Sequence, residues 1–130
     1  MVRNEVIIKS NNINTDYCII SFSSKHNHKP EFVRSLTKFS NDADLYFYYD
    51  TNDLWYSKGI DGISTNVDES VRYLKNICKK YKYVYCIGSS MGGYAAILYG
   101  SLIKVDYVLA FIPQTIITNY VDYKYTDLKN

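Results

Sequence analysis

Short apolar runs alternate with amphipathic segments along most of the chain. The runs at residues 6–8, 17–22, 44–49, 83–87 and 107–112 predict five strands. The run from Tyr17 to Phe22 is apolar at consecutive positions, as expected of a strand that is covered on both faces. Strands that alternate with helical segments are typical of a mostly parallel sheet. The pattern therefore predicts an α/β domain.

Three segments between the strands have apolar residues at helical spacing. The strongest of them starts at Asn66, which forms a capping pair with Glu69. Its apolar stripe is Val67, Val71, Leu74, Cys78 and Tyr81. A second helix is predicted after Pro30, with Phe32, Val33, Leu36 and Phe39 on one face. A third is predicted from Met91 to Tyr99, ended by Gly100.

Residues 50–65 have no sustained period, which predicts a long ordered loop or a lid. This loop contains Trp55 and Tyr56. Loops at the carboxyl ends of parallel strands are where such sheets bind ligands, so the two aromatic residues are candidates for one wall of a substrate pocket. The alternative is that they cover the core, and the sequence leaves both interpretations open.

Length and composition fit one domain over residues 1–130. The chain is 47% hydrophobic and 22% charged, and no apolar run approaches the roughly 18 residues of a membrane span. The amino terminus lacks the apolar stretch of a secretory signal, so we expect a cytoplasmic protein without a membrane partner. The cysteines Cys18, Cys78 and Cys86 match neither a zinc site nor a disulfide framework, and we expect buried thiols and no metal.

The net charge of +2 is spread along the sequence, apart from Lys79, Lys80 and Lys82. Lysines at the end of a helix that begins with Asp68 and Glu69 complement the helix dipole. This arrangement explains the basic cluster without a partner. We therefore expect no binding to nucleic acid.

The residues with the clearest chemical signature form the string Gly88-Ser89-Ser90-Met91-Gly92-Gly93, which contains G-x-S-x-G. It lies where a predicted strand must turn into a predicted helix. Such a turn lifts the serine hydroxyl above the sheet edge and holds the serine in a strained conformation. The Met91 N–H would then be one donor of an oxyanion hole. The alternatives are a turn that merely packs closely or one that cradles a phosphate.

The segment from Tyr83 to Pro113 resembles the nucleophile-elbow region of the α/β-hydrolase superfamily. It is especially similar to bacterial serine esterase-like and acyl-transfer proteins, and more distantly to hydrolase-like accessory proteins of bacterial glycoprotein secretion. The resemblance implies a three-layer α/β/α fold with about five mostly parallel strands. It also implies that the backbone of Phe22, Ser23 or Ser24 supplies the second oxyanion donor.

The sequence departs from this family in its histidines, because none occurs beyond His28. Either the carboxy-terminal strands of the family are missing, or the base comes from elsewhere. His26 or His28 could approach Ser90 as general base, or both could be exposed loop residues. Three aspartates are candidates for the acid: Asp122 and Asp127 in the tail, and Asp50 after a strand. Gln114 is expected to line the same edge.

These patterns indicate a serine-dependent hydrolase or acyltransferase that forms an acyl-enzyme at Ser90 and needs no cofactor. The substrate would be a small-molecule or glycan-linked ester. One alternative is a non-catalytic binding or accessory protein with a hydrolase-like scaffold. Another is a fragment completed by a partner or by a second copy, since the strand at residues 107–112 would leave an exposed edge.

Overall fold

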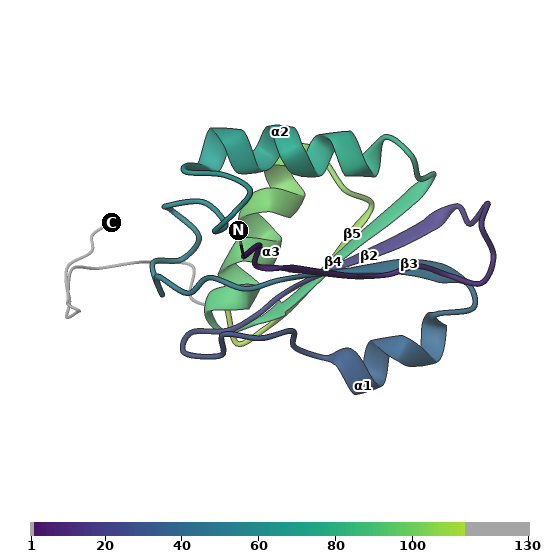
Figure 1. Ribbon diagram of the computed structural model, residues 1–130, viewed down its shortest axis with the longest axis horizontal. Coiled ribbons are helices and arrows are strands. Elements are labelled where there is room, and N and C mark those ends of the chain that lie inside the picture. Colours follow the sequence, from purple (N-terminus) through teal and green to yellow (C-terminus); the bar gives the residue numbers. More distant parts are fainter. Residues whose placement is uncertain (1, 114–130) are drawn as a thin grey trace.

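The computed structural model of the chain describes residues 2–113. Its secondary structure alternates strands with helices, as Figure 1 shows. The strands are β1 (Glu5–Ile8), β2 (Tyr17–Phe22), β3 (Ala43–Tyr48), β4 (Tyr83–Ser89) and β5 (Tyr107–Phe111). The helices are α1 (Val33–Leu36), the short 3-10 helix η1 (Thr37–Phe39), α2 (Val67–Cys78) and α3 (Met91–Ile103).

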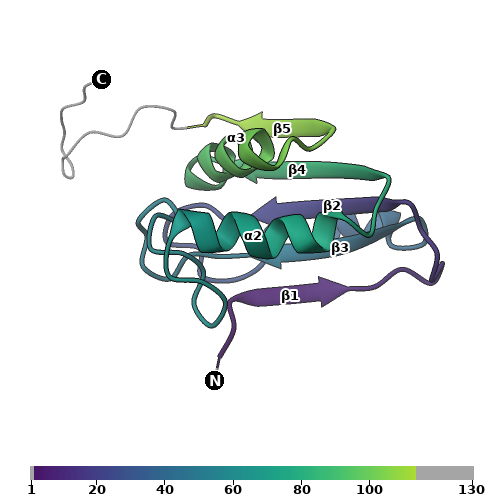
Figure 2. The same cartoon turned by 90° about the horizontal axis from the view of Figure 1, so that it is seen from above.

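The strands form one sheet in the order β1-β3-β2-β4-β5 (Figure 2). Strand β1 runs antiparallel to β3, and the other neighbours are parallel. Helices α2 and α3 cover one face, and α1 lies on the other (Figure 1). The predicted three-layer α/β fold with a mostly parallel sheet is confirmed. Because β2 to β5 are parallel, the loops that follow them leave the sheet at one edge.

The main core lies between the sheet and the helices α2 and α3. Phe22 on β2 is fully buried, and its ring stacks on Tyr99 of α3 with centroids 5.5 Å apart. A smaller cluster on the other face joins Leu36 of α1 to Ala43, Leu45 and Phe47 of β3. Strand β3 is buried along its whole length. Strands β2 and β3 are therefore firmly packed, and the loops that follow them start from a well-ordered part of the sheet.

The helix predicted after Pro30 is much shorter than expected. It begins only at Val33, because Phe32 has a left-handed backbone with φ 66° that cannot continue a helix. The third helix is longer than expected, since Gly100 does not end it. A Cβ at Gly100 would lie 2.6 Å from Val108 Cγ2, so this glycine allows α3 to pack closely on β5. The helix ends at Ile103, before the left-handed Lys104.

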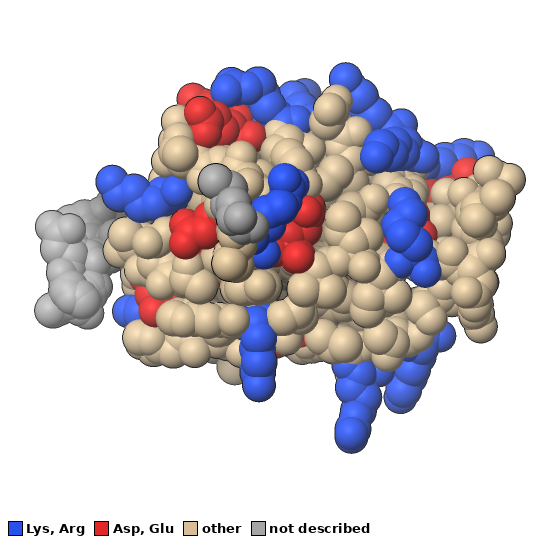
Figure 3. Space-filling model, in the orientation of Figure 1, with Lys and Arg blue, Asp and Glu red and all other residues tan. Residues whose placement is uncertain are grey.

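The predicted start of α2 is confirmed. The Asn66 side chain accepts a hydrogen bond of 2.8 Å from the Glu69 N–H. The helix ends at Cys78, with Lys79 as its C-cap, so the lysines lie at and just beyond its end. In Figure 3, acidic side chains gather over the start of α2 and basic ones over the remainder. This distribution agrees with the dipole interpretation.

Strand β5 lies at the edge of the sheet, and much of its apolar surface is exposed. Its outward side chains include Tyr107 and Leu109, which are 61% and 54% exposed. On the α1 side of the sheet, the Tyr85 ring stacks on Tyr107 with centroids 5.1 Å apart. The described part of the chain thus leaves an apolar sheet face over β4 and β5 without a covering helix. Association through this edge, one of the hypotheses above, remains a prediction.

Membrane spans, metal sites and cysteine thiols were also considered in the sequence. Within residues 2–113, no helix is long and apolar enough to cross a membrane. In the same range, no three His, Cys, Asp or Glu side chains cluster in a way that would hold a metal ion. Cys18 and Cys86 are buried thiols, as expected, and Cys78 is partly buried. Burial raises the pKa of the Cys78 thiol to about 11, so it stays protonated near neutral pH.

Candidate active site

Ser90 occupies the sharp turn between β4 and α3. Its backbone has φ 56° and ψ −119°, a conformation that costs a residue with a side chain about 1–3 kcal/mol. The turn is held from both sides: the Ser90 N–H donates to Phe111 O at 2.9 Å, and the Ser90 carbonyl accepts from Tyr94 N at 3.0 Å. The residue is half-buried. The surrounding backbone therefore fixes a strained serine at the carboxyl edge of the sheet.

The glycines on either side of Ser90 are required by close backbone contacts. A Cβ at Gly88 would lie 2.0 Å from the Gly92 carbonyl oxygen. A Cβ at Gly92 would lie 2.0 Å from the Phe22 carbonyl oxygen, at the end of β2. These contacts confirm the expectation that a side chain at either position would collide with a neighbouring element. They also bring the end of β2 against the first turn of α3.

Helix α3 starts directly after Ser90, at Met91. The first amides of a helix have no acceptor within it, and they lie at the positive end of its dipole. In α3 these amides belong to Met91, Gly92 and Gly93. Met91 N–H therefore suits an oxygen that gains negative charge beside Ser90.

The backbone amides of Ser23 and Ser24, the other predicted oxyanion donors, each have an acceptor within the protein, and their role at the oxyanion remains a prediction. Phe22 pairs with Gly88 in the parallel ladder, so Ser23 and Ser24 leave the sheet beside the Ser90 turn. The Ser23 N–H donates to Tyr48 O at 2.9 Å, and the Ser24 N–H donates to Glu31 Oε1 at 3.1 Å. These two hydrogen bonds stabilise the loop after β2. Neither is free for an oxyanion in this structure.

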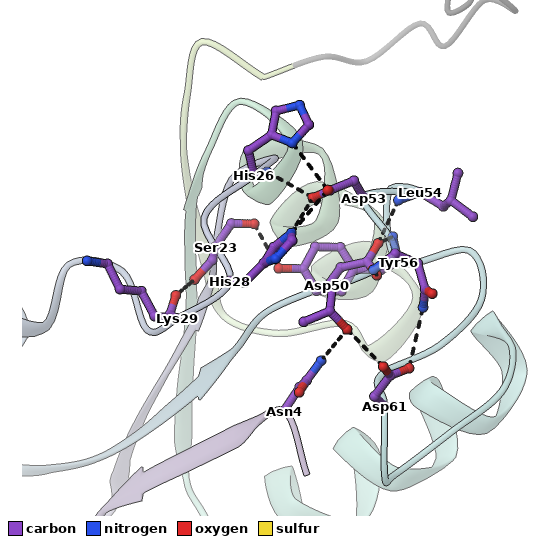
Figure 4. A network of polar contacts seen from close by, with 12 residues as sticks. Asn4, Ser23, His26, His28, Lys29, Asp50, Asp53, Leu54, Tyr56 and Asp61 are labelled. Carbon is purple, nitrogen blue, oxygen red and sulfur yellow. Dashed lines mark hydrogen bonds and ion pairs between the residues drawn. The ribbon is translucent and has the colours of Figure 1, made fainter. Parts of the chain in front are cut away.

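His26 and His28 are both turned toward one carboxylate, that of Asp53 (Figure 4). His28 Nε2 lies 3.0 Å from both carboxylate oxygens. His26 Nδ1 lies 3.2 Å from Oδ2, and the His26 backbone N–H donates to Oδ1 at 2.8 Å. Asp53 is not among the site residues predicted from the sequence, because it lies in an aperiodic loop 25 residues or more from both histidines.

The pKa of Asp53 lies below its usual value. Partial burial by itself raises this pKa, but the hydrogen bonds from the His26 N–H and the His28 ring, with the charges of both rings, outweigh burial and lower it. The carboxylate is therefore ionised at neutral pH. An ionised carboxylate can only accept hydrogen bonds, so the ring nitrogens that face it carry protons.

The Asp50 carboxylate binds backbone amides of its own loop instead of a histidine. Its buried carboxylate accepts hydrogen bonds of 2.9 Å from the backbone N–H groups of Asn52, Leu54 and Tyr56. These bonds fold the start of the long loop back onto the end of β3. Asp50 thereby places Asp53, which is three residues further on, next to the histidines (Figure 4).

The two aromatic residues of the long loop differ in position. Tyr56 is fully buried, and its hydroxyl donates to Ser23 O at 2.8 Å, so it is a core residue and not a pocket wall. Trp55 is partly buried and lies under the Lys25 ammonium, 4.8 Å from the ring centroid. Among the described residues, Trp55 Nε1 is a buried donor without an acceptor. Trp55 therefore remains a candidate for substrate contact.

The remaining predicted site residues fall outside the described part of the chain. These are Gln114, Asp122 and Asp127. The acid and edge-lining roles suggested for them remain predictions.

Comparison with known proteins identifies similarity in fold. No family model matches the chain, and no curated protein sequence matches it. The capsule O-acetyltransferase of Neisseria meningitidis serogroup A is similar in structure, with a TM-score of 0.63 and 17% identity over 91% of this chain and 50% of that chain. A monoacylglycerol lipase of Paleococcus ferrophilus has a TM-score of 0.57 and 14% identity over 92% and 46% of the two chains.

A third similar structure is a protein of unknown function from Staphylococcus aureus subsp. aureus Mu50. Its TM-score is 0.56, and it is 16% identical over 84% of this chain and 40% of its own. The chain thus spans half or less of the length of each of these three structures. Two of these neighbours are hydrolase or acyltransferase proteins by name, and the fold of this chain is consistent with theirs.

Proposed function

We propose that the chain forms an acyl-enzyme at Ser90 and acts as an esterase-like hydrolase or an acyltransferase. The observation that carries this proposal is the backbone of Ser90, a strained serine held at the carboxyl edge of a parallel sheet and at the start of a long helix. Such strain persists where the surrounding structure enforces it, and it is concentrated at functional sites. The likeness in fold to an O-acetyltransferase and a lipase supports the same reaction class.

In the proposed reaction, Ser90 Oγ attacks the carbonyl carbon of an ester while a base takes the hydroxyl proton. The carbonyl oxygen becomes an oxyanion beside the Met91 N–H and the amino terminus of α3. Collapse of this intermediate breaks the bond to the leaving alcohol, which receives the proton. The acyl group on Ser90 then passes to water in a hydrolase, or to another hydroxyl in an acyltransferase.

The loop after β2 is the source we propose for the base, since it runs beside the Ser90 turn and carries His26 and His28. Trp55 is the residue we propose to line the substrate pocket, because it is partly buried in the loop after β3 and its indole N–H has no acceptor among the described residues. A small-molecule or glycan-linked carboxylic ester fits this chemistry, which draws on no metal or organic cofactor.

An active-site probe tests the proposal. A fluorophosphonate reagent should label the folded wild-type protein, and labelling should disappear after heat denaturation. Ser90→Ala should not be labelled. Ser89→Ala is the matched control, because Ser89 is an adjacent, half-buried serine on β4, and it should be labelled like the wild type. Equal labelling of Ser90→Ala and the wild type would exclude Ser90 as the nucleophile.

The engaged amides of Ser23 and Ser24 favour the alternative, a non-catalytic protein with a hydrolase-like scaffold. Without a second donor, the oxyanion is less stabilised, and loss of one such donor costs on the order of 10²–10³ in rate. This alternative predicts no probe labelling of folded protein at any pH from 6 to 9. The same labelling experiment therefore separates the two functions.

A further inference from the structure

The carboxylate of Asp53 is the meeting point of two loops that leave adjacent strands. One loop follows β2 and carries both histidines, and the other follows β3 and carries Asp53 (Figure 4). The Ser90 turn follows β4, the neighbour of β2 on its other side. The histidine loop therefore lies between the Asp53 loop and Ser90 in the order of the strands.

The backbone on both sides of this contact is held in an uncommon conformation. His26 has φ 66° and Asp53 has φ 53°, in the left-handed region that residues with a side chain seldom adopt. The contacts described above hold both residues in place. The His26 N–H donates to Asp53, and the amides after Asp50 are bound by the Asp50 carboxylate. The two loops thus stabilise each other in one geometry.

The two histidines present different nitrogens to Asp53. His26 faces it with Nδ1, which leaves Nε2 on the far side of the ring. His28 faces it with Nε2, within 3.0 Å of both oxygens. In serine hydrolases with an acid and a histidine, the carboxylate binds the Nδ1–H and leaves Nε2 to take the proton of the serine. His26 has this arrangement, and His28 does not.

We propose that Asp53 is a positioning residue that orients His26 as the general base for Ser90, while His28 fixes the carboxylate. This inference rests on the proposed function. The Ser90 hydroxyl proton passes to His26 Nε2 as the Oγ–carbon bond forms, and the Nδ1–H stays on the ring, next to Asp53. The same proton then passes from Nε2 to the leaving alcohol as its bond to carbon breaks. The acid thus precedes the nucleophile in sequence.

The charged groups around His26 agree with this role. Asp53 faces it directly, His28 shares the carboxylate, and the Lys25 ammonium is drawn to the Trp55 ring. The nearby Asp61 binds Thr51 and Asn52 instead, so it is a matched carboxylate in the same loop without a histidine contact. His26 is 76% exposed at its side chain, which leaves Nε2 accessible.

The experiment follows the rate of p-nitrophenyl acetate acylation of Ser90 across pH in purified full-length protein. Asp53→Asn should lower the rate by on the order of 10²-fold or more, and Asp61→Asn should leave it within about twofold. Asp53→Glu, which restores a carboxylate, should recover part of the rate lost in Asp53→Asn. A merely structural role would not respond to the return of the carboxylate in this way.

His26→Gly gives a second test that does not depend on Asp53 folding effects. Glycine adopts φ 66° without strain, so this variant should fold at least as well as the wild type. It should lose on the order of 10²-fold or more in rate, and added imidazole should restore part of it. His28→Ala should lose less than about tenfold and should not respond to imidazole.

The outcomes separate the two proposals. If fluorophosphonate fails to label wild-type Ser90, the proposed function falls and this inference falls with it. If Ser90 is labelled but Asp53→Asn and His26→Gly acylate at the wild-type rate, the inference alone is overturned. It is equally overturned if His28→Ala loses the activity and His26→Gly keeps it. Imidazole rescue of His26→Gly, absent in Ser90→Ala, would support it.

Discussion

Replacing Gly92 by alanine should destabilise the protein by about 2 kcal/mol or more. The added Cβ would lie 2.0 Å from the Phe22 carbonyl oxygen, 2.8 Å from its carbonyl carbon and 3.0 Å from the carbonyl carbon of Ser23. All three are backbone atoms at the end of β2. That strand is paired on both sides, with β3 and β4, so it cannot retreat without loss of ladder hydrogen bonds.

Two opposing terms set the magnitude. Alanine is favoured over glycine in a helix by about 1 kcal/mol, and Gly92 is the second residue of α3. Overpacking costs about 1–3 kcal/mol in cores that can adjust, and more where the clash is with fixed backbone. We expect the clash to exceed the gain in helix propensity. A net loss of about 2 kcal/mol is a large part of the 5–15 kcal/mol that usually stabilises a domain.

Urea unfolding followed by the fluorescence of the single tryptophan, Trp55, measures this loss. With a slope of about 1–3 kcal/mol per molar urea, a loss of about 2 kcal/mol should lower the midpoint by roughly 0.7–2 M. Gly93→Ala is the matched control, since its Cβ would lie 3.2 Å from Pro113 Cα and Cβ and 3.3 Å from the Gly88 carbonyl oxygen, contacts that shifts of a few tenths of an ångström relieve. Its midpoint should change much less. Equal midpoints for Gly92→Ala and Gly93→Ala would refute the close contact between α3 and β2.

Three further predictions concern the turn, the pH dependence and the sheet edge. Ser90→Gly should raise the free energy of unfolding by about 1 kcal/mol relative to Ser90→Ala, because only glycine relieves the strain at φ 56°, and urea unfolding of both variants checks this. The pKa of Asp44 is lowered: burial raises it, but hydrogen bonds from Lys9, the Ser10 N–H and Tyr81 outweigh burial. The stabilisation from Asp44 should therefore be complete above the unfolded pKa of about 3.9 and be lost as the pH falls through the folded pKa. The urea midpoints of the wild type and Asp44→Asn should differ at pH 7 and converge near pH 2. Leu109→Lys should weaken any concentration-dependent association seen by sedimentation, and a wild type that is monomeric at all concentrations would exclude association through β5.

The site was only partly predictable. The candidate nucleophile and its glycines could be found because the string from Gly88 to Gly93 is typical of a sharp strand-to-helix turn. The acceptors of the Ser23 and Ser24 amides could not be predicted, because the sequence does not record that Tyr48 binds the first and Glu31 the second. Those bonds depend on how the loop after β2 folds back on itself and on β3.

Local patterns in the sequence predict which segments form strands and helices and where the sharp turn at Ser90 falls. These features arise from periodicity, capping and glycine, which act between residues a few positions apart. The contacts of Asp53 with His26 and His28, and the close approach of Gly92 to Phe22, arise from the packing of the folded chain. Such pairs lie tens of residues apart and become neighbours only when parallel strands bring their loops to one edge of the sheet, so no local pattern marks them.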